Sequence, residues 1–248
     1  MPLILALPVA GAFGALFFRV NARNAEAWLA GTCALAAFAI VLGYAPQVSR
    51  GETVRLAFDW MPSLGLAFSL RMDGFAWMFS LMVTGIGFLV VLYARYYMSA
   101  RDPVPRFFAF LLGFMASMLG VVLAGNLIQL VLFWELTSLF SFLLIGYWHH
   151  NPAARDGARM ALIVTSAGGL ALFAGALLVG RIVGSYDLDA VLASGDLIRS
   201  HALYVPAMTL VVIAALTKSA QFPFHFWLPH AMAAPTPVMT AQPTREAT

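Results

Sequence analysis

The amino-acid sequence predicts an all-α membrane protein with about seven transmembrane helices. Hydrophobic residues make up 62% of the 248 residues and charged residues only 10%, whereas a soluble domain is roughly half apolar and a quarter charged. The charged residues lie in short stretches between apolar runs long enough to cross a bilayer, which takes about 20 residues per helix. These runs also exceed the roughly 9–11 residues of a barrel strand. We therefore expect helices whose solvent is the lipid bilayer.

The apolar runs give the expected order of these helices. They are Leu3 to Phe18, Ala27 to Ala45, Phe75 to Tyr97, Phe107 to Ala124, Leu127 to Trp148, Ala158 to Val183 and Leu203 to Phe222. The first run is not interpreted as a signal peptide, because no basic residue precedes it and Arg19 and Arg23 follow it, which reverses the charge order of a signal peptide. We interpret it as a retained helix whose N-terminus lies outside.

Two connections between the runs are informative. Residues Arg50 to Asp73, between the second and third runs, alternate apolar and polar side chains, which predicts a small extramembrane hairpin. The fourth and fifth runs are joined by little more than Gly125 and Asn126. We therefore expect the fourth and fifth helices to be antiparallel neighbours.

Prolines interrupt the chain at the end of the seventh run. Pro223 and Pro229 follow closely after Phe222, and Pro235 and Pro237 come next. Proline lacks an amide donor and its ring clashes with the preceding turn, so the seventh helix is predicted to be broken. Irregular chain at membrane depth is tolerated where it is buried in protein or lines a wet cavity, which makes this segment a candidate transport element. A loop lying on the membrane surface is the alternative.

The arginines indicate how the chain is oriented, because short cytoplasmic loops carry an excess of Lys and Arg. With the N-terminus outside, the cytoplasmic loops carry Arg19, Arg23, Arg95, Arg101, Arg106, Arg155 and Arg159, and the external loops carry Arg50, Arg55, Arg71, Arg181 and Arg199. This distribution predicts a multi-pass protein of the bacterial inner (plasma) membrane. Since the basic residues are scattered singly, the net charge of +3 does not indicate a nucleic-acid partner.

Several classes of chemistry have no support in the sequence. A P-loop, a dinucleotide-binding fingerprint and a G-x-S-x-G nucleophile elbow are all missing, so we expect no soluble enzyme and no cofactor. The single cysteine, Cys33, has no partner for an internal disulfide or a thiolate metal site, and we interpret it as a small core residue.

Two charged residues are predicted to lie inside apolar runs. Glu135 lies near the middle of the fifth run and Lys218 in the last third of the seventh. Charges within a membrane are costly unless they are paired or hydrated, and they are functional by default, so an acid and a base in different helices could form a switchable ion pair. Glu135 could instead be a protonated packing residue bonded to Ser138, and Lys218 could extend to the membrane surface.

His225 and His230 are a further candidate pair near the predicted break. They are five residues apart around Pro229 and lack the i, i+4 spacing of paired metal ligands, so no metal site is predicted. Because imidazole titrates near neutral pH, a role as a proton relay is a hypothesis for both.

Three motifs share one resemblance. They lie in residues 125–148, with Trp-Glu-Leu-Thr-Ser at their centre, in residues 73–97, and in residues 217–229, where Lys-Ser-Ala-Gln leads to Trp-Leu-Pro. Together they resemble the large A subunit of Mrp-type multisubunit sodium/proton antiporters, which is related to the antiporter-like subunits of respiratory complex I. The resemblance covers Met1 to about Val238. It implies that Glu135 and Lys218 are the glutamate and lysine that switch during proton transfer, within a half-channel of a Na+ and/or K+/proton antiporter that works with other subunits.

The resemblance stops near Val238. The family continues into an eighth helix, whereas Met239 to Thr248 is polar and unrelated. We therefore expect residues 1–238 to be the N-terminal half of an antiporter-like transmembrane module, followed by a polar tail at 239–248 that is disordered or results from a frameshift or truncated gene. Alone, such a chain is not expected to catalyse antiport. The alternatives are a proton-pumping subunit of complex I or of a membrane-bound hydrogenase, or an inert truncated remnant.

Overall fold

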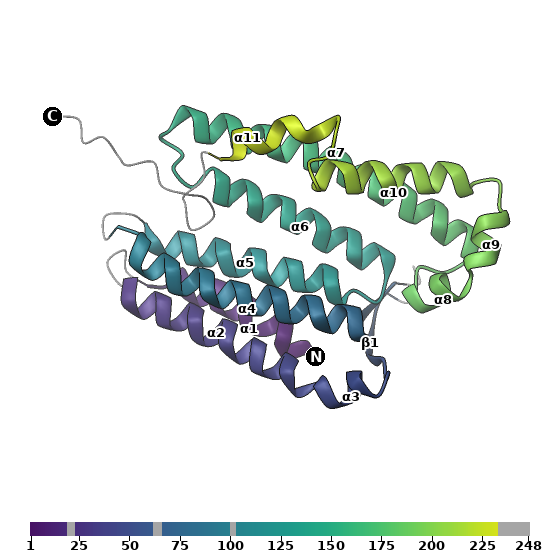
Figure 1. Cartoon of the computed structure of the whole chain (residues 1–248), viewed down its shortest axis with the longest axis horizontal. Coiled ribbons are helices and arrows are strands. Elements are labelled where there is room, and N and C mark those ends of the chain that lie inside the picture. Colours follow the sequence, from purple (N-terminus) through teal and green to yellow (C-terminus); the bar gives the residue numbers. More distant parts are fainter. Residues whose placement is uncertain (19–22, 62–65, 100–102, 233–248) are drawn as a thin grey trace.

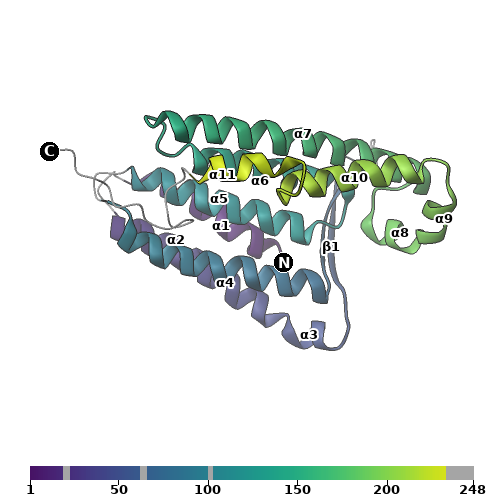
Figure 2. The ribbon, with the colours of Figure 1, turned by 45° about the horizontal axis from the view of Figure 1, so that its top comes forward.

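The computed structural model describes residues 1–18, 23–61, 66–99 and 103–232. The predicted tail at 239–248 lies outside these residues. The helices are α1 (Pro2–Ala15), α2 (Arg23–Gly43), α3 (Ala45–Ser49), α4 (Gly74–Tyr97), α5 (Val104–Leu123), α6 (Leu127–Ile145), α7 (Pro152–Val183), α8 (Leu188–Ala193), α9 (Gly195–Ser200), α10 (Tyr204–Lys218), a short 3-10 turn at Phe224–Phe226 and α11 (Trp227–Ala231). The long helices lie side by side along the long axis of the molecule (Figures 1 and 2).

The prediction of a helical membrane protein is confirmed, and each predicted run contains a helix. Within the described residues, five helices are long and apolar enough to cross a membrane: Asn24–Ser49 (α2 with α3), α4, α5, α6 and α7. The other two apolar helices, α1 and α10, are shorter. The count of about seven spans therefore stays a prediction. Helix α7 has 32 residues, or about 48 Å of helix, which exceeds a hydrocarbon core of about 30 Å, so it must tilt or extend beyond the core.

Side-chain caps fix where several helices begin. Asp73 accepts a hydrogen bond from the Ala76 amide (2.8 Å) at the start of α4, and Asn126 accepts from the Ile128 amide (2.8 Å) at the start of α6. Asn151 caps α7, which begins at Pro152, six residues before the start that the sequence predicted. An Asn followed by Pro at the first helical position is a standard start signal, because proline has no amide that needs a partner.

Residues 50–73, where a hairpin was predicted, contain two antiparallel strands. Strand β1 (Val54–Met61) pairs with β2 (Leu66–Met72), and Leu56 lies opposite Leu70. Strand β2 also bridges to the α5–α6 turn through Leu70 and Ala124. That the hairpin lies outside the membrane stays a prediction.

An ion-pair cluster joins this hairpin to α8. The Arg71 guanidinium contacts both Asp73 and Asp189 (2.9 Å to Asp189), and Arg55 also contacts Asp189 (2.8 Å). Burial opposes charge on Asp73, but the Ala76 amide and the Arg71 guanidinium outweigh it and lower the pKa of this carboxyl below its ordinary value. The cluster lies at the end of the molecule that also carries the N-terminus, α3 and α9 (Figure 1).

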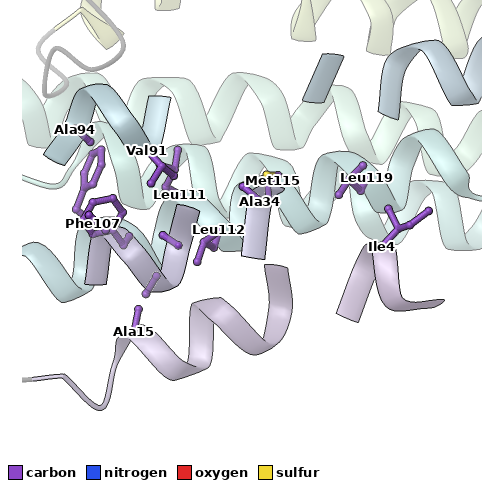
Figure 3. Close-up of a cluster of buried hydrophobic side chains, with 14 of the residues drawn as sticks. Ile4, Ala15, Ala34, Val91, Ala94, Phe107, Leu111, Leu112, Met115 and Leu119 are labelled. Carbon is purple, nitrogen blue, oxygen red and sulfur yellow. The ribbon is translucent and has the colours of Figure 1, made fainter. Parts of the chain in front are cut away.

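The main apolar core lies between α1, α2, α4 and α5. Ile4, Ala34, Leu112 and Leu119 are fully buried there, and Met115 is 4% exposed. Figure 3 shows these side chains converging from α1, α2 and α5. A second, smaller cluster contains only Ile145, Ala158 and Ala161 among its buried residues, on α6 and α7. Apolar side chains thus pack helices α1, α2, α4 and α5 together. The cluster between α6 and α7 contains smaller buried side chains.

Candidate functional site

The predicted break in the last apolar run is present and places Lys218 at a helix end. Helix α10 ends at Lys218, and helical structure resumes at Phe224. The residue before a proline disfavours the helical conformation, which explains why the break precedes Pro223. The Trp227 indole donates to the carbonyl of Thr217 (3.0 Å), one of the acceptors that the end of α10 leaves free. After the break, α11 lies along α7 (Figure 1).

The Lys218 ammonium lies against α6. It donates hydrogen bonds to the hydroxyls of Thr137 (2.6 Å) and Ser138 (2.8 Å) and is 3.5 Å from the Trp134 carbonyl oxygen. Its nitrogen also lies 5.2 Å from the centre of the Trp134 ring, a cation–π distance. Thr137 and Ser138 are each 1% exposed. A lysine at the end of α10 is therefore held by buried polar groups of another helix, and its ammonium does not extend to the surface.

Glu135 lies on α6 and faces α7. A Cβ added at Gly169 would collide with the Glu135 Oε1 atom, so the missing side chain at 169 provides the space for the carboxyl group. Among the described residues, Oε1 is buried and has no hydrogen-bond partner. A buried carboxyl oxygen without a partner is costly, and such an exception calls for an explanation.

Glu135 and Lys218 are near neighbours that are not directly paired. The ion pairs within 4.0 Å among the described residues do not include one between them. Glu135 and Ser138 are three residues apart on one helix, and such side chains are neighbours on one face. The lysine is therefore bound about one helical turn from the carboxyl group.

The two histidines lie on the segment after the break, and both are exposed. The Nδ1 atom of His230 is 2.9 Å from the Phe226 carbonyl oxygen, and the His225 ring stacks on Phe222 at 6.0 Å. The hydrogen bonds described for these residues join neither histidine to the Glu135–Lys218 region. Within the described part of the chain, His, Cys, Asp and Glu form no group of three that could hold a metal ion.

The sequence reading missed several residues of the site. Ser138 was considered only in the alternative reading of Glu135, as its hydrogen-bond partner, but the Ser138 hydroxyl accepts from Lys218. Trp134, Thr137 and Ser138 are spaced i, i+3, i+4, which is the one signal that could have placed them on the same face. The glycine at 169 gave no signal, because the sequence does not show which helix Glu135 faces.

A second buried carboxyl group, outside this site, was also missed. Glu26 was left outside the second run, which was predicted to begin at Ala27, but α2 begins at Arg23 and Glu26 lies in its first turn. It is 0% exposed, and neither carboxyl oxygen has a hydrogen-bond partner among the described residues.

Two family models match parts of this chain. Residues 124–241 match the family model described as NADH:quinone oxidoreductase/Mrp antiporter, TM. Residues 60–108 match the one described as NADH-Ubiquinone oxidoreductase (complex I), chain 5 N-terminus. Over these two stretches the chain is similar to the NADH:quinone oxidoreductase/Mrp antiporter family. The resemblance found in the three sequence motifs is thereby confirmed.

Curated members of the family are similar over most of this chain. It is 63% identical to a probable K(+)/H(+) antiporter subunit of Rhizobium meliloti (strain 1021) over 96% of its length, but spans only 24% of that protein. It is 43% identical to a Na(+)/H(+) antiporter subunit of Alkalihalophilus pseudofirmus over 89% of its length and spans 28% of that protein. The chain thus spans about a quarter of the length of these relatives.

Two solved structures of this family and its wider fold are similar as well. The Mrp complex from Dietzia sp. DQ12-45-1b contains a chain that is 34% identical, with a TM-score of 0.79, over 95% of this chain and 26% of that one. The membrane-bound sulfane sulfur reductase, an archaeal respiratory membrane complex, contains one that is 19% identical with a TM-score of 0.83, over 96% of this chain and 48% of that one. The second likeness shows the fold alone.

Proposed function

We propose that this chain is part of the ion-translocating subunit of a monovalent cation/proton antiporter, and that Glu135 and Lys218 transfer protons within it. The observation that carries the proposal is the Lys218 ammonium bound to Thr137 and Ser138 hydroxyls, one turn from a buried carboxyl group. Ionisable groups within a membrane are costly, and they are usually found where they serve a proton or ion path.

The arrangement supports a simple switching mechanism. When the ammonium approaches Glu135, its positive charge favours release of the proton from the carboxyl group. When the ammonium returns to the hydroxyls, the carboxyl group again favours the protonated form, because it lies in a buried space beside Gly169. Movement of Lys218 over about one helical turn would thus couple its position to the charge of Glu135. His225 and His230, beyond the break, would relay protons to or from this pair.

The remaining parts of the proposal concern the whole transporter. The names of the relatives support K+ or Na+ as the exchanged cation, since one is called a K(+)/H(+) and another a Na(+)/H(+) antiporter subunit. They also support other subunits as partners, in a bacterial plasma membrane. The respiratory alternative shares the fold, but relatives 42–63% identical carry antiporter names, which favours antiport over quinone-linked pumping.

A chimera tests the proposed activity. Residues 1–238 would replace the matching segment of the 63% identical Rhizobium meliloti protein, with that protein's partner subunits present. We expect everted membrane vesicles to show cation-dependent collapse of a proton gradient, measured with a pH dye and added potassium or sodium. Lys218→Ala and Glu135→Gln should each abolish this response, whereas Arg199→Ala, at an exposed ion pair on α9, should retain it. Full activity in Lys218→Ala would refute the proposed role of the pair.

Labelling tests the proposed orientation, in which the end carrying Met1 faces outside. Ser99 and Ser200 are exposed; Ser99 follows α4 and Ser200 ends α9, and the end of α4 and α9 lie at opposite ends of the molecule (Figure 1). In a Cys33→Ala background, an impermeant thiol reagent added to intact cells should label Ser200→Cys, and should label Ser99→Cys only after the membrane is opened. Labelling of both from one side would contradict the helix count, and the reverse pattern would contradict the orientation.

A further inference from the structure

The acceptors around Lys218 are already arranged to receive an ammonium group. The Thr137 hydroxyl donates to the Trp134 carbonyl (2.6 Å), and the Ser138 hydroxyl also points its proton toward that carbonyl (3.4 Å). Because a hydroxyl has one proton and two lone pairs, these bonds leave the oxygen lone pairs of both residues available to Lys218. The two hydroxyls therefore accept from the lysine without rearranging their own protons.

Thr137, Ser138 and Trp134 together offer the Lys218 ammonium two close acceptors and a weaker third contact. An ammonium has three protons to donate. Thr137 and Ser138 accept two at 2.6 and 2.8 Å, and the third has the Trp134 carbonyl at 3.5 Å and the ring of Trp134 at 5.2 Å. Hydrogen bonds of this kind lower the cost of holding the ammonium in a low-dielectric interior.

We propose that Thr137, Ser138 and Trp134 form a resting seat that holds the Lys218 ammonium away from Glu135. The inference rests on the proposed function, in which Lys218 moves to and from Glu135. It gives the ammonium a second binding position besides the carboxylate. Thr137 and Ser138 are then positioning residues. They oppose the attraction between the two charges, which is strong in a buried site, and so they keep the carboxyl group free to gain or lose a proton.

The sequence permits a direct test of this seat, because Lys218 is the only lysine among the 248 residues. Labelling with 15N-lysine therefore reports a single side-chain nitrogen. With 13C at the glutamate carboxyl carbons, solid-state NMR of the chain in lipid bilayers measures the dipolar coupling between Lys218 and Glu135. We expect weak coupling in the unmodified chain. In the double variant Thr137→Val/Ser138→Ala the ammonium should move to the carboxylate, and the coupling, which varies as the inverse cube of the distance, should rise roughly twofold for each one-fifth shortening of the separation.

Matched variants separate the seat from general effects of lost hydroxyls. Thr84 and Ser117 are also buried, and their hydroxyls donate to carbonyls four residues earlier on α4 and α5. Thr84→Val/Ser117→Ala should leave the coupling unchanged, and so should Thr137→Ser, which keeps its hydroxyl. Glu135→Gln in the double variant should remove the increase.

The outcomes decide the inference without a transport measurement. Strong coupling already present in the unmodified chain, or coupling unchanged in the double variant, would overturn the seat. If the double variant does not fold, the two single variants decide, and unchanged coupling in both would equally overturn it. Because transport is measured separately in the chimera, a failure of the proposed antiport would show there and would leave the NMR result intact.

Discussion

The two sets of helices in this molecule pack together through different kinds of side chains. Helices α1, α2, α4 and α5 enclose one apolar cluster that contains large side chains such as Phe107 and Leu112. Helices α6, α7 and α10 meet instead through small and hydroxyl-bearing residues, among them Gly168, Gly169 and Thr137. Close approach through small residues is the usual way that helices pack in membranes, where lipid removes much of the hydrophobic driving force.

The difference explains where charge can be accommodated. In the second set, the space beside the glycines admits a carboxyl group, and hydroxyls on the neighbouring face hold an ammonium. In the first set, Glu26 is also buried, but its carboxyl oxygens lack hydrogen-bond partners among the described residues. Small residues thus allow a polar site to be built, whereas the apolar cluster leaves the buried Glu26 carboxyl group without a hydrogen-bond partner among the described residues.

The largest effect is expected from filling the space beside Glu135. In Gly169→Ala, the added methyl group would overlap the carboxyl oxygen, so either the side chain or helices α6 and α7 must shift. Overpacking of this kind typically costs about 1–3 kcal/mol. We expect the chimera to lose antiport in the pH-dye assay. Gly43→Ala is the matched control, because the added methyl group at the end of α2 meets nothing within 4 Å, and it should retain antiport. Unchanged activity in Gly169→Ala would contradict the close packing that distinguishes the second set.

Replacing the buried carboxyl group of the first set, that of Glu26, should stabilise the protein. Glu26→Met replaces a carboxyl group that has no hydrogen-bond partner among the described residues by an apolar side chain of similar size. Removing a buried unsatisfied polar group is worth about 1–3 kcal/mol, so we expect the variant to unfold at a higher temperature in detergent. Glu52→Met, at an exposed ion pair with Arg50, should change stability by no more than about 0.5 kcal/mol. Lower stability or lost antiport in Glu26→Met would show that this carboxyl group has a partner or a role, and the comparison between the two sets would fail.

Much of this arrangement could be predicted from the sequence. The apolar runs located every long helix, and the isolated charges pointed to Glu135 and Lys218, because a charge within an apolar run has few structural explanations. The prolines after Phe222 correctly indicated a break, since proline constrains its own backbone and the residue before it.

The parts that the sequence did not reveal depend on contacts between helices. Ser138 lies on the same face as Glu135, but which of them binds Lys218 depends on where α10 ends against α6. Glu26 was missed because helix boundaries are the least certain part of a sequence reading, and a start at Arg23 moved it from a loop into a buried turn. The spacing of residues in the sequence shows which side chains share one face of a helix. It does not show which residues of another helix pack against that face.

The smallest expected effect tests the end of the molecule that joins the two sets. Asp73 caps α4 and contacts Arg71, which also contacts Asp189 on α8. Because its pKa is lowered in the folded chain, its contribution should be complete above the ordinary aspartate pKa of about 4 and should disappear as the pH falls through the lower folded value. Loss of a helix cap typically costs about 1 kcal/mol, so Asp73→Ala should lower the unfolding temperature at neutral pH and approach the unmodified chain below about pH 4. Asn151 also caps a helix, through the Ala153 amide, but its amide does not titrate. Asn151→Ala should therefore lower the unfolding temperature by a similar amount at both pH values, and an equally constant difference in Asp73→Ala would show that the charge of Asp73 contributes nothing to the junction.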